Sequence, residues 1–277
     1  MKKIIALVLT ALMMIGFASC GSDSKKSTSS GEKKVLKVGL ECAYAPFNWT
    51  QLDNSNGAVP ISGTNQFAGG YDVEIAKKIA AGLNMELEIV KTTWEGLIPA
   101  VQTGVIDLII AGMSPTDERK ESVDFSEKYY TSDLVIVVKA NGKYANAAAL
   151  ADFSGAKIVA QKGTFHAEVV KQITGVVEQT PLADFGTMIT ALKSGTVDGY
   201  VSERPGALSA VAANSDFKMI SFEGDKGFTA SEQDTSIAIG MKKNSELREK
   251  INEILSGISE EQRAQIMNNA IANQPKE

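Results

Sequence analysis

Short runs rich in apolar and β-branched residues alternate with amphipathic segments along this chain. Each run is four to eight residues long or shorter, as expected for a strand, and Gly, Asp or Lys residues flank most of them. Alternation of this kind predicts an α/β protein with mixed, largely parallel sheets flanked by helices. The predicted strands are residues 35–40, 87–90, 107–111, 134–138, 157–160, 200–201 and 236–239.

Two helices can be placed from the spacing of their apolar residues. Over residues 73–83 the apolar side chains fall on one helical face, and Asp72 stands where an N-cap is expected. Over residues 94–101 apolar residues recur at i, i+3, i+4 and i+7. Thr93 is the expected cap of this second helix, and Gly104 is its expected end.

Two further segments have distinct local signatures. Ser259 has capping-box spacing to Gln262, ahead of an amphipathic stretch, and therefore predicts a C-terminal helix. Residues 51–69 are rich in Asn, Ser, Gly and Gln and show little periodicity. They predict a surface loop inserted between the first strand and the first helix.

The N-terminus carries an export signal. Lys2 and Lys3 precede an apolar run over residues 4–17, which is short for a membrane span and typical of a signal peptide. Small residues then lead to Cys20 in the order FASCG, which resembles the lipobox of bacterial lipoproteins. We expect residues 1–19 to be removed and Cys20 to carry a lipid that anchors the chain to the outer face of the cytoplasmic membrane. The alternative is a secreted protein cut near residue 19.

A solvated linker is expected to separate this anchor from the folded part. Residues 20–34 are mainly Ser, Thr, Lys and Gly and contain little that could seed a core. No later run is long and apolar enough for a transmembrane helix, which favours a chain tethered at one end over a membrane-spanning receptor. The remaining residues, about 240, suffice for one large domain or two modest ones.

Composition argues against several classes of partner and cofactor. The net charge of −5 and the isoelectric point near 5.2 argue against nucleic acid. Only Cys20 and Cys42 are present, so the chain has no disulfide framework and no zinc-type Cys/His spacing. We therefore expect no metal and no cofactor. Cys42 is expected to be a small buried residue, and the single histidine, His166, is expected to be a packing or surface residue.

Several blocks, in this order, resemble one known family. The first is the helix GYDVEIAKKIAAGL at 70–83. Similar blocks follow at 94–102, 107–112, 114–119, 123–126, 129–130, 161–165 and 192–198, leading to Glu203. Together they resemble the polar amino-acid family, family 3, of bacterial extracellular solute-binding proteins of ABC importers. Collinear blocks are more specific than one motif, and the resemblance extends from about residue 35 to the end.

The resemblance implies a fold and a set of partners. The fold is the two-lobed periplasmic-binding-protein type II fold, in which two hinge crossovers join the lobes and the ligand lies between them. The implied partners are a small-molecule amino acid, an ABC permease and its ATPase, and the protein is expected to be a monomer. Carried onto this chain, lobe 1 is residues 35–131 and 236–277, lobe 2 is residues 138–230, and the crossovers are residues 132–137 and 231–235.

The resemblance also assigns the groups that hold the two charged ends of an amino acid. A cleft that removes a zwitterion from water must supply a cation, an anion and hydrogen-bonding dipoles. Arg119 matches the arginine that binds the α-carboxylate, because its planar guanidinium can form two hydrogen bonds. Ser114, Phe165 and Thr164 are implied beside it, whereas Gly112, Ser114 and Glu203 are implied at the α-ammonium. Asp198 is the rival acid, but it matches the family's strand-entry aspartate.

Selection of the ligand side chain is expected to depend on Glu41, Tyr44, Trp94 and Gln161. Tyr44 and Trp94 can sandwich an aliphatic or guanidinium group. Glu41 opposes an acidic ligand, because an unpaired like charge in a closed cleft costs several kcal/mol. The expected ligand is therefore a cationic L-amino acid of the arginine or lysine type, with a neutral polar amino acid or cystine as the alternative.

An enzyme on the same fold is the competing class. A cyclohexadienyl-dehydratase-like enzyme would use an acid in the cleft to protonate a leaving hydroxyl group. The complete set of groups for a zwitterion argues against it, because tight binding of the ground state does not accelerate a reaction. We therefore expect a binding protein without catalytic residues.

Overall fold

The computed structural model describes residues 33–275 of the 277-residue chain. The predicted signal peptide, the predicted lipidation site Cys20 and most of the predicted linker lie outside the described residues. Within residues 33–275, no helix is long and apolar enough to cross a membrane.

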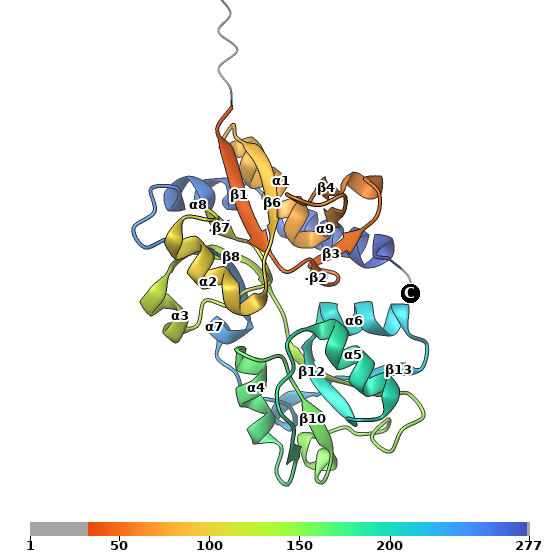
Figure 1. The fold of residues 1–277 in the computed structure, drawn as a ribbon. Coiled ribbons are helices and arrows are strands. Elements are labelled where there is room, and N and C mark those ends of the chain that lie inside the picture. The colour runs from red at the N-terminus through yellow and green to blue at the C-terminus, as the bar shows by residue number, and fades with distance from the viewer. Residues whose placement is uncertain (1–32, 276–277) are drawn as a thin grey trace, which may run out of the picture. The chain divides into compact units, whose positions relative to one another are not determined.

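One mixed sheet organises the first part of the described chain (Figure 1). Four of its strands run in one direction, and the strand that comes last in sequence is antiparallel to both of its neighbours. The side chains of Leu36, Val38 and Leu40 are fully buried in its core. In spatial order the strands are β6 (Glu86–Lys91), β1 (Val35–Leu40), β7 (Leu108–Ile109), β14 (Ser236–Met241) and β8 (Asp124–Thr131).

Helices pack against this sheet and against one another. α1 (Tyr71–Gly82) contacts β6 and two C-terminal helices, α8 (Arg248–Ser256) and α9 (Glu260–Asn273), while α2 (Trp94–Thr103) contacts β1, β7 and β14 (Figure 1). The short α3 (Asp117–Ser122) follows β7. We call this sheet, its helices and the small sheet described below lobe 1.

A second mixed sheet forms the core of lobe 2. Its two shortest strands lie parallel to β12, and β9 is antiparallel to both of its neighbours. The order is β11 (Val177–Glu178), β10 (Lys157–Val159), β12 (Gly199–Glu203), β9 (Leu134–Lys139) and β13 (Phe217–Ile220). The helices of lobe 2 are α4 (Phe165–Val169), α5 (Phe185–Ser194) and α6 (Arg204–Ala213), with 3₁₀ turns η2 (Leu150–Phe153), η3 (Val170–Gln172) and η4 (Gly224–Lys226).

The chain passes between the two sheets twice. It leaves β8 and enters β9 at Leu134, which falls inside the stretch 132–137 predicted as a crossover. It returns through α7 (Glu232–Thr235) into β14. The two passages touch, because the backbone N–H of Ser132 donates to the carbonyl of Thr235 at 3.0 Å.

The prediction of a surface loop over residues 51–69 was only partly correct, because short strands interrupt an otherwise irregular and mostly exposed segment. Short antiparallel strands form a third sheet here, in the order β2 (Ala43–Tyr44), β3 (Asn48–Gln51), β5 (Phe67–Gly69) and β4 (Val59–Pro60), with η1 (Ser55–Gly57) between β3 and β4. Strands of two to four residues are too short to produce a visible alternation in sequence. They are stabilised instead by pairing across the sheet, as between Thr50 and Ala68.

The predicted helix boundaries were confirmed at α2 and α9 but not at α1. Thr93 is the N-cap of α2, Gly104 ends it with a left-handed φ of 78°, and Ser259 forms the capping box of α9. The N-cap of α1 is Gly70, whose φ is 125°. Asp72 is instead completely buried, where it accepts hydrogen bonds from Asn48 and from the hydroxyl of Tyr129.

Candidate functional site

Arg119 extends from lobe 1 to lobe 2. It lies in the first turn of α3, where the N-cap Thr116 accepts a hydrogen bond from its backbone N–H. Its guanidinium donates through Nη1 to the carbonyl of Ser114 at 2.8 Å, and through Nη2 to the carbonyl of Gly163 in lobe 2 at 3.0 Å. The group also stacks 5.0 Å from the ring of Trp94. Burial lowers the pKa of Arg119 to about 10, which leaves it a cation at neutral pH.

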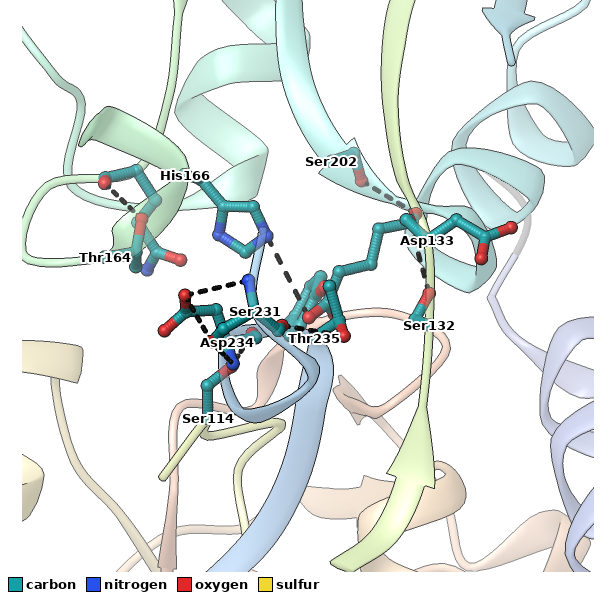
Figure 2. A network of polar contacts seen from close by, with 12 residues as sticks. Ser114, Ser132, Asp133, Thr164, His166, Ser202, Ser231, Asp234 and Thr235 are labelled. Carbon is teal, nitrogen blue, oxygen red and sulfur yellow. Dashed lines mark hydrogen bonds and ion pairs between the residues drawn. The ribbon is translucent and has the colours of Figure 1, made fainter. Parts of the chain in front are cut away.

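Hydrogen bonds to other segments fix the loop between β7 and α3. Gly112 has a φ of 64°, a conformation that favours glycine, and a Cβ added there would lie only 3.0 Å from the ring of Tyr44. Its N–H donates to the hydroxyl of Tyr129 at 3.2 Å. The buried hydroxyl of Ser114 donates to the carbonyl of Asp234 in α7 at 2.7 Å (Figure 2). This loop is therefore hydrogen-bonded to a crossover segment.

Glu203 is a buried carboxylate at the end of β12. Its Oε2 accepts a 2.5 Å hydrogen bond from the hydroxyl of Tyr44 in lobe 1, whereas its Oε1 has no hydrogen-bond partner among the described residues. Burial raises the pKa of Glu203 to about 7, although the hydrogen bond from Tyr44 and the charge of Arg119 act in the opposite direction. Asp198, the rival acid, instead accepts from the backbone N–H of Lys157 at the entry to the sheet.

Glu41 and Gln161 form a second contact between the lobes. The side chain of Gln161 donates to Glu41 Oε1 at 3.1 Å and to the carbonyl of Ala183 at 3.0 Å. Glu41 is only 7% exposed, and its Oε2 has no hydrogen-bond partner within residues 33–275. Burial raises the pKa of Glu41 to about 7, and the nearby charge of Asp184 contributes in the same direction.

The start of α4 faces the same region. The hydroxyl of Thr164 donates to the carbonyl of Gln161 at 2.7 Å, and Phe165 is the first helical residue. The ring of Phe165 lies 4.5 Å from that of His166, which is buried. His166 was expected to be a packing or surface residue. Its burial is that of a packing residue, but neither ring nitrogen has a hydrogen-bond partner.

Eight of the ten predicted ligand-site residues line one small cavity, whose volume is about 10 Å³. The other two, Glu41 and Glu203, do not line it, but each accepts a hydrogen bond from a lining residue, Glu41 from Gln161 and Glu203 from Tyr44. The cavity is lined by Tyr44, Trp94, Gly112, Ser114, Arg119, Gln161, Thr164, Phe165, His166 and Phe185.

Two of these lining residues were missed in the sequence analysis. Phe185 stacks on Tyr44 with ring centroids 4.1 Å apart, and no motif pointed to it beyond its place after the helix cap Asp184. His166 directly follows the block that ends at Phe165, so its position was the available signal. Within residues 33–275, no group of three or more His, Cys, Asp or Glu side chains is arranged to hold a metal ion.

Comparisons with known proteins identify the family. Residues 36–271 match the profile of bacterial extracellular solute-binding proteins, family 3. The arginine-binding extracellular protein ArtP of Bacillus subtilis is 30% identical over 92% of each chain. A probable histidine-binding protein of Campylobacter jejuni is 31% identical and covers 83% of this chain and 85% of its own.

A solved structure shows the same architecture. It is the amino acid ABC transporter substrate-binding protein AbpA of Streptococcus pneumoniae bound to L-arginine, with a TM-score of 0.72 and 30% identity. The match covers 86% of this chain and 94% of that one. The α/β fold with two mixed sheets is thus shared with a solute-binding protein over nearly the whole described chain. The chain belongs to the bacterial extracellular solute-binding proteins, family 3.

Proposed function

We propose that this protein binds a free, cationic L-amino acid between its lobes and presents it to an ABC importer. The observation that carries this proposal is the approach of Arg119 from lobe 1 and Glu203 from lobe 2 to one small cavity, which Arg119 lines and whose lining residue Tyr44 is hydrogen-bonded to Glu203. A cation from one lobe and an anion from the other are what a desolvated zwitterion requires. The names of the relatives, which are binding proteins for arginine and histidine and a transporter protein bound to L-arginine, support the same class of ligand.

The α-carboxylate is assigned to Arg119 and its neighbours. Two of the guanidinium N–H groups now donate to the carbonyls of Ser114 and Gly163, and three remain for a carboxylate. Ser114, Thr164 and Phe165 line the same cavity, and since the Thr164 hydroxyl already donates its proton to the Gln161 carbonyl, the backbone N–H groups of Ser114 and Phe165 are the proposed further donors. Charge-assisted hydrogen bonds of this kind contribute about 1.5–3 kcal/mol each.

The α-ammonium is assigned to Glu203, the carbonyl of Gly112 and the hydroxyl oxygen of Ser114. Glu203 Oε1 is buried without a partner, and an ammonium group would satisfy it. The Ser114 hydroxyl donates its proton to Asp234, so its oxygen lone pairs remain available to accept.

The cationic side chain is assigned to Glu41. Its Oε2 is a second buried acceptor without a partner, and Asp184 adds further negative charge nearby. Gln161 holds the carboxylate in place, while the rings of Tyr44 and Trp94 line the approach. A guanidinium or ammonium group would both pair with Glu41 and contact these rings. Arginine or lysine fits this arrangement better than a neutral polar amino acid or cystine.

Binding is proposed to proceed by opening and closure of the two lobes. A cavity of about 10 Å³ holds about one water molecule, so an amino acid enters only when the contacts between the lobes separate. A ligand that bonds to both lobes then shifts the population back to the closed form. Closure is the state that a permease could recognise.

The extracytoplasmic location is proposed to depend on a lipid at Cys20. The support is the sequence alone, in which small residues precede Cys20 after the predicted signal peptide. Metabolic labelling with a radioactive fatty acid should label the wild-type protein and leave Cys20→Ala unlabelled, and labelling of both would refute the anchor.

A binding screen tests the proposed function. Thermal shift with the twenty amino acids, ornithine, citrulline and cystine should show the largest stabilisation with arginine or lysine, and titration calorimetry should then give the affinity. Arg119→Ala should lose at least about 100-fold in affinity, because two or more charge-assisted bonds are removed. Arg248→Ala, an exposed arginine on α8, is the matched control and should bind as the wild type does. Equal affinity of Arg119→Ala and wild type would refute the assignment.

A further inference from the structure

His166 is a buried imidazole without a hydrogen-bond partner. It is 7% exposed and projects from α4 (Figure 2), and neither Nδ1 nor Nε2 has a hydrogen-bond partner in the part of the chain that the structure describes. A buried polar group without a partner costs about 1–3 kcal/mol. Such a group in a folded protein calls for a physical reason, such as a partner that arrives with the ligand.

Six buried side-chain atoms of the described residues have no hydrogen-bond partner, and four of them belong to His166, Glu203 and Glu41, while the other two belong to Asn48 and Tyr200. His166 lines the cavity, and Glu203 and Glu41 are hydrogen-bonded to the lining residues Tyr44 and Gln161. His166 Nε2 lies 3.9 Å from Glu203 Oε1, which is too far for a hydrogen bond between them. The contact is drawn as the dashed line that leaves the His166 ring in Figure 2.

The spacing suits two acceptors that share one donor group. A nitrogen placed about 2.9 Å from both atoms, which are 3.9 Å apart, would see them at an angle of about 85°. This angle lies within reach of two N–H bonds of one ammonium group. A single ammonium nitrogen could therefore satisfy both buried acceptors.

The charged surroundings favour the neutral, accepting form of the ring. Burial, followed by the charge of Arg119, lowers the pKa of His166 to about 3. The charged and titratable groups around it are Arg119 on α3, Glu203 on β12 and, through Glu203, the hydroxyl of Tyr44 on β2. The ring of Phe165 packs 4.5 Å away and limits its rotation.

We infer that His166 is a further ligand-binding residue, whose neutral ring accepts a hydrogen bond from the α-ammonium group held by Glu203. The inference rests on the proposed function, since it adds a contact to the same site. It also implies a proton-linked affinity. When the lobes open, the ring regains solvent and an ordinary pKa near 6.5, so binding at acidic pH requires His166 to lose a proton first.

Two substitutions distinguish the role of His166 as a hydrogen-bond acceptor from the role of its ring in filling space. His166→Leu removes the acceptor and should weaken binding of L-arginine, used as the probe, by roughly ten- to 100-fold in titration calorimetry. His166→Gln retains an acceptor oxygen and should lose much less. Unliganded thermal unfolding of both variants reports any purely structural effect.

A ligand that lacks the α-ammonium provides the matched control. With 5-guanidinopentanoic acid, which is arginine without its amino group, wild type and His166→Leu should bind with equal affinity. If His166→Leu loses the same factor with both ligands, or loses nothing with arginine, the inference is overturned. If no amino acid binds the wild type, the proposed function fails as well, whereas normal binding that depends on Arg119 but not on His166 refutes only this inference.

The pH profile gives an independent test. Below pH 6.5 the affinity of the wild type should fall by up to about tenfold per pH unit relative to His166→Gln. Glu41, Glu203 and Asp72 are present in both proteins, so their titration cancels in this ratio. If the affinities of the wild type and His166→Gln change equally between pH 7.5 and 5.5, the proton linkage and the role of the neutral ring are overturned.

Discussion

The hydroxyl of Tyr44 donates a 2.5 Å hydrogen bond to Glu203 Oε2, although the two residues are 159 positions apart in the sequence. Tyr44 belongs to the small sheet of lobe 1, and Glu203 ends the central strand β12 of lobe 2. The bond therefore joins the lobes through Glu203, a residue that we assign to ligand binding. Because an ammonium group would bind the free Oε1, the same carboxylate can hold the lobes together and hold the ligand.

Tyr44→Phe is predicted to shift the unliganded protein toward the open form. It leaves Glu203 Oε2 without its donor at a cost of about 1–3 kcal/mol in the closed form, while the stacking of the ring on Phe185 is retained. Small-angle X-ray scattering should show a larger radius of gyration without ligand. Tyr144→Phe is the control, because the Tyr144 hydroxyl accepts only from Lys143 within lobe 2. An unchanged radius for Tyr44→Phe would contradict the prediction.

Glu41 is predicted to make the unliganded protein more stable in mild acid. Its pKa is raised from 4.5 to about 7 by burial, so the closed, folded form binds a proton that the unfolded chain releases. The resulting stabilisation is complete below pH 4.5 and is lost as the pH rises through 7. Between pH 8 and pH 5 the unfolding free energy of wild type should therefore rise by roughly 2–3 kcal/mol relative to Glu41→Gln.

Urea denaturation at both pH values measures this difference. Comparison with Glu41→Gln cancels the contributions of Glu203, Asp72 and His166, which titrate in both proteins. Glu95→Gln is the control, since Glu95 is exposed and pairs with Lys162 across the lobes. The unfolding free energy of Glu95→Gln should change with pH as that of the wild type does. If the unfolding free energies of the wild type and Glu41→Gln change equally with pH, the proposed proton uptake is ruled out.

Local signals in the sequence reveal most of the regular elements. The turn that closes α2 at Gly104 and the capping box at Ser259 depend on neighbouring residues only, so they could be predicted. Both lobes also contain a similar contact, in which an aspartate that follows a helix accepts a hydrogen bond from one backbone N–H of a neighbouring strand. Asp107 accepts from Lys37 and Asp198 from Lys157, each at 2.8 Å.

The parts that could not be predicted depend on contacts between distant segments. Asp72 resembles a helix cap locally, but its hydrogen bonds to Asn48 and Tyr129 make it a buried structural acid. Arg119 and Glu203 could be proposed only because collinear blocks resemble a family, since neither residue has a local signal. His166 has no local signature either, and its significance comes from the unpartnered atom of Glu203 nearby.

Tyr129→Phe is predicted to weaken ligand binding indirectly, since Tyr129 does not line the cavity. The Tyr129 hydroxyl donates to Asp72 at 2.7 Å and accepts from the N–H of Gly112 at 3.2 Å, so it fixes the loop whose carbonyl we assign to the ammonium. Its loss should cost about 1–3 kcal/mol in stability and roughly tenfold in affinity. Tyr71→Phe, which removes only a bond to the Tyr129 carbonyl, should lower stability without changing affinity. Equal affinities of both variants in calorimetry would contradict this role.

The C-terminal end of α9 forms a further link between the lobes, at Gln274. Gln274 is 7% exposed, accepts from the hydroxyl of Ser209 in α6 and donates through Nε2 to the Ser209 carbonyl at 3.1 Å. Since α9 belongs to lobe 1 and α6 to lobe 2, these two bonds favour the closed form before any ligand binds. Figure 1 shows the C-terminal end of α9 near α6.

Gln274→Ala is therefore predicted to reduce the affinity for the ligand, although Gln274 does not line the cavity. The loss of two neutral hydrogen bonds, at about 1 kcal/mol each, should destabilise closure and lower the affinity by roughly five- to 20-fold. Gln265→Ala is the matched control on the same helix, because the Gln265 side chain contacts only Asn269 on the exposed face. Calorimetry should separate the two variants, and scattering should show the unliganded Gln274→Ala protein more open. If both glutamine variants bind like wild type, closure does not depend on this link, and the contacts around Glu203 and Arg119 alone determine it.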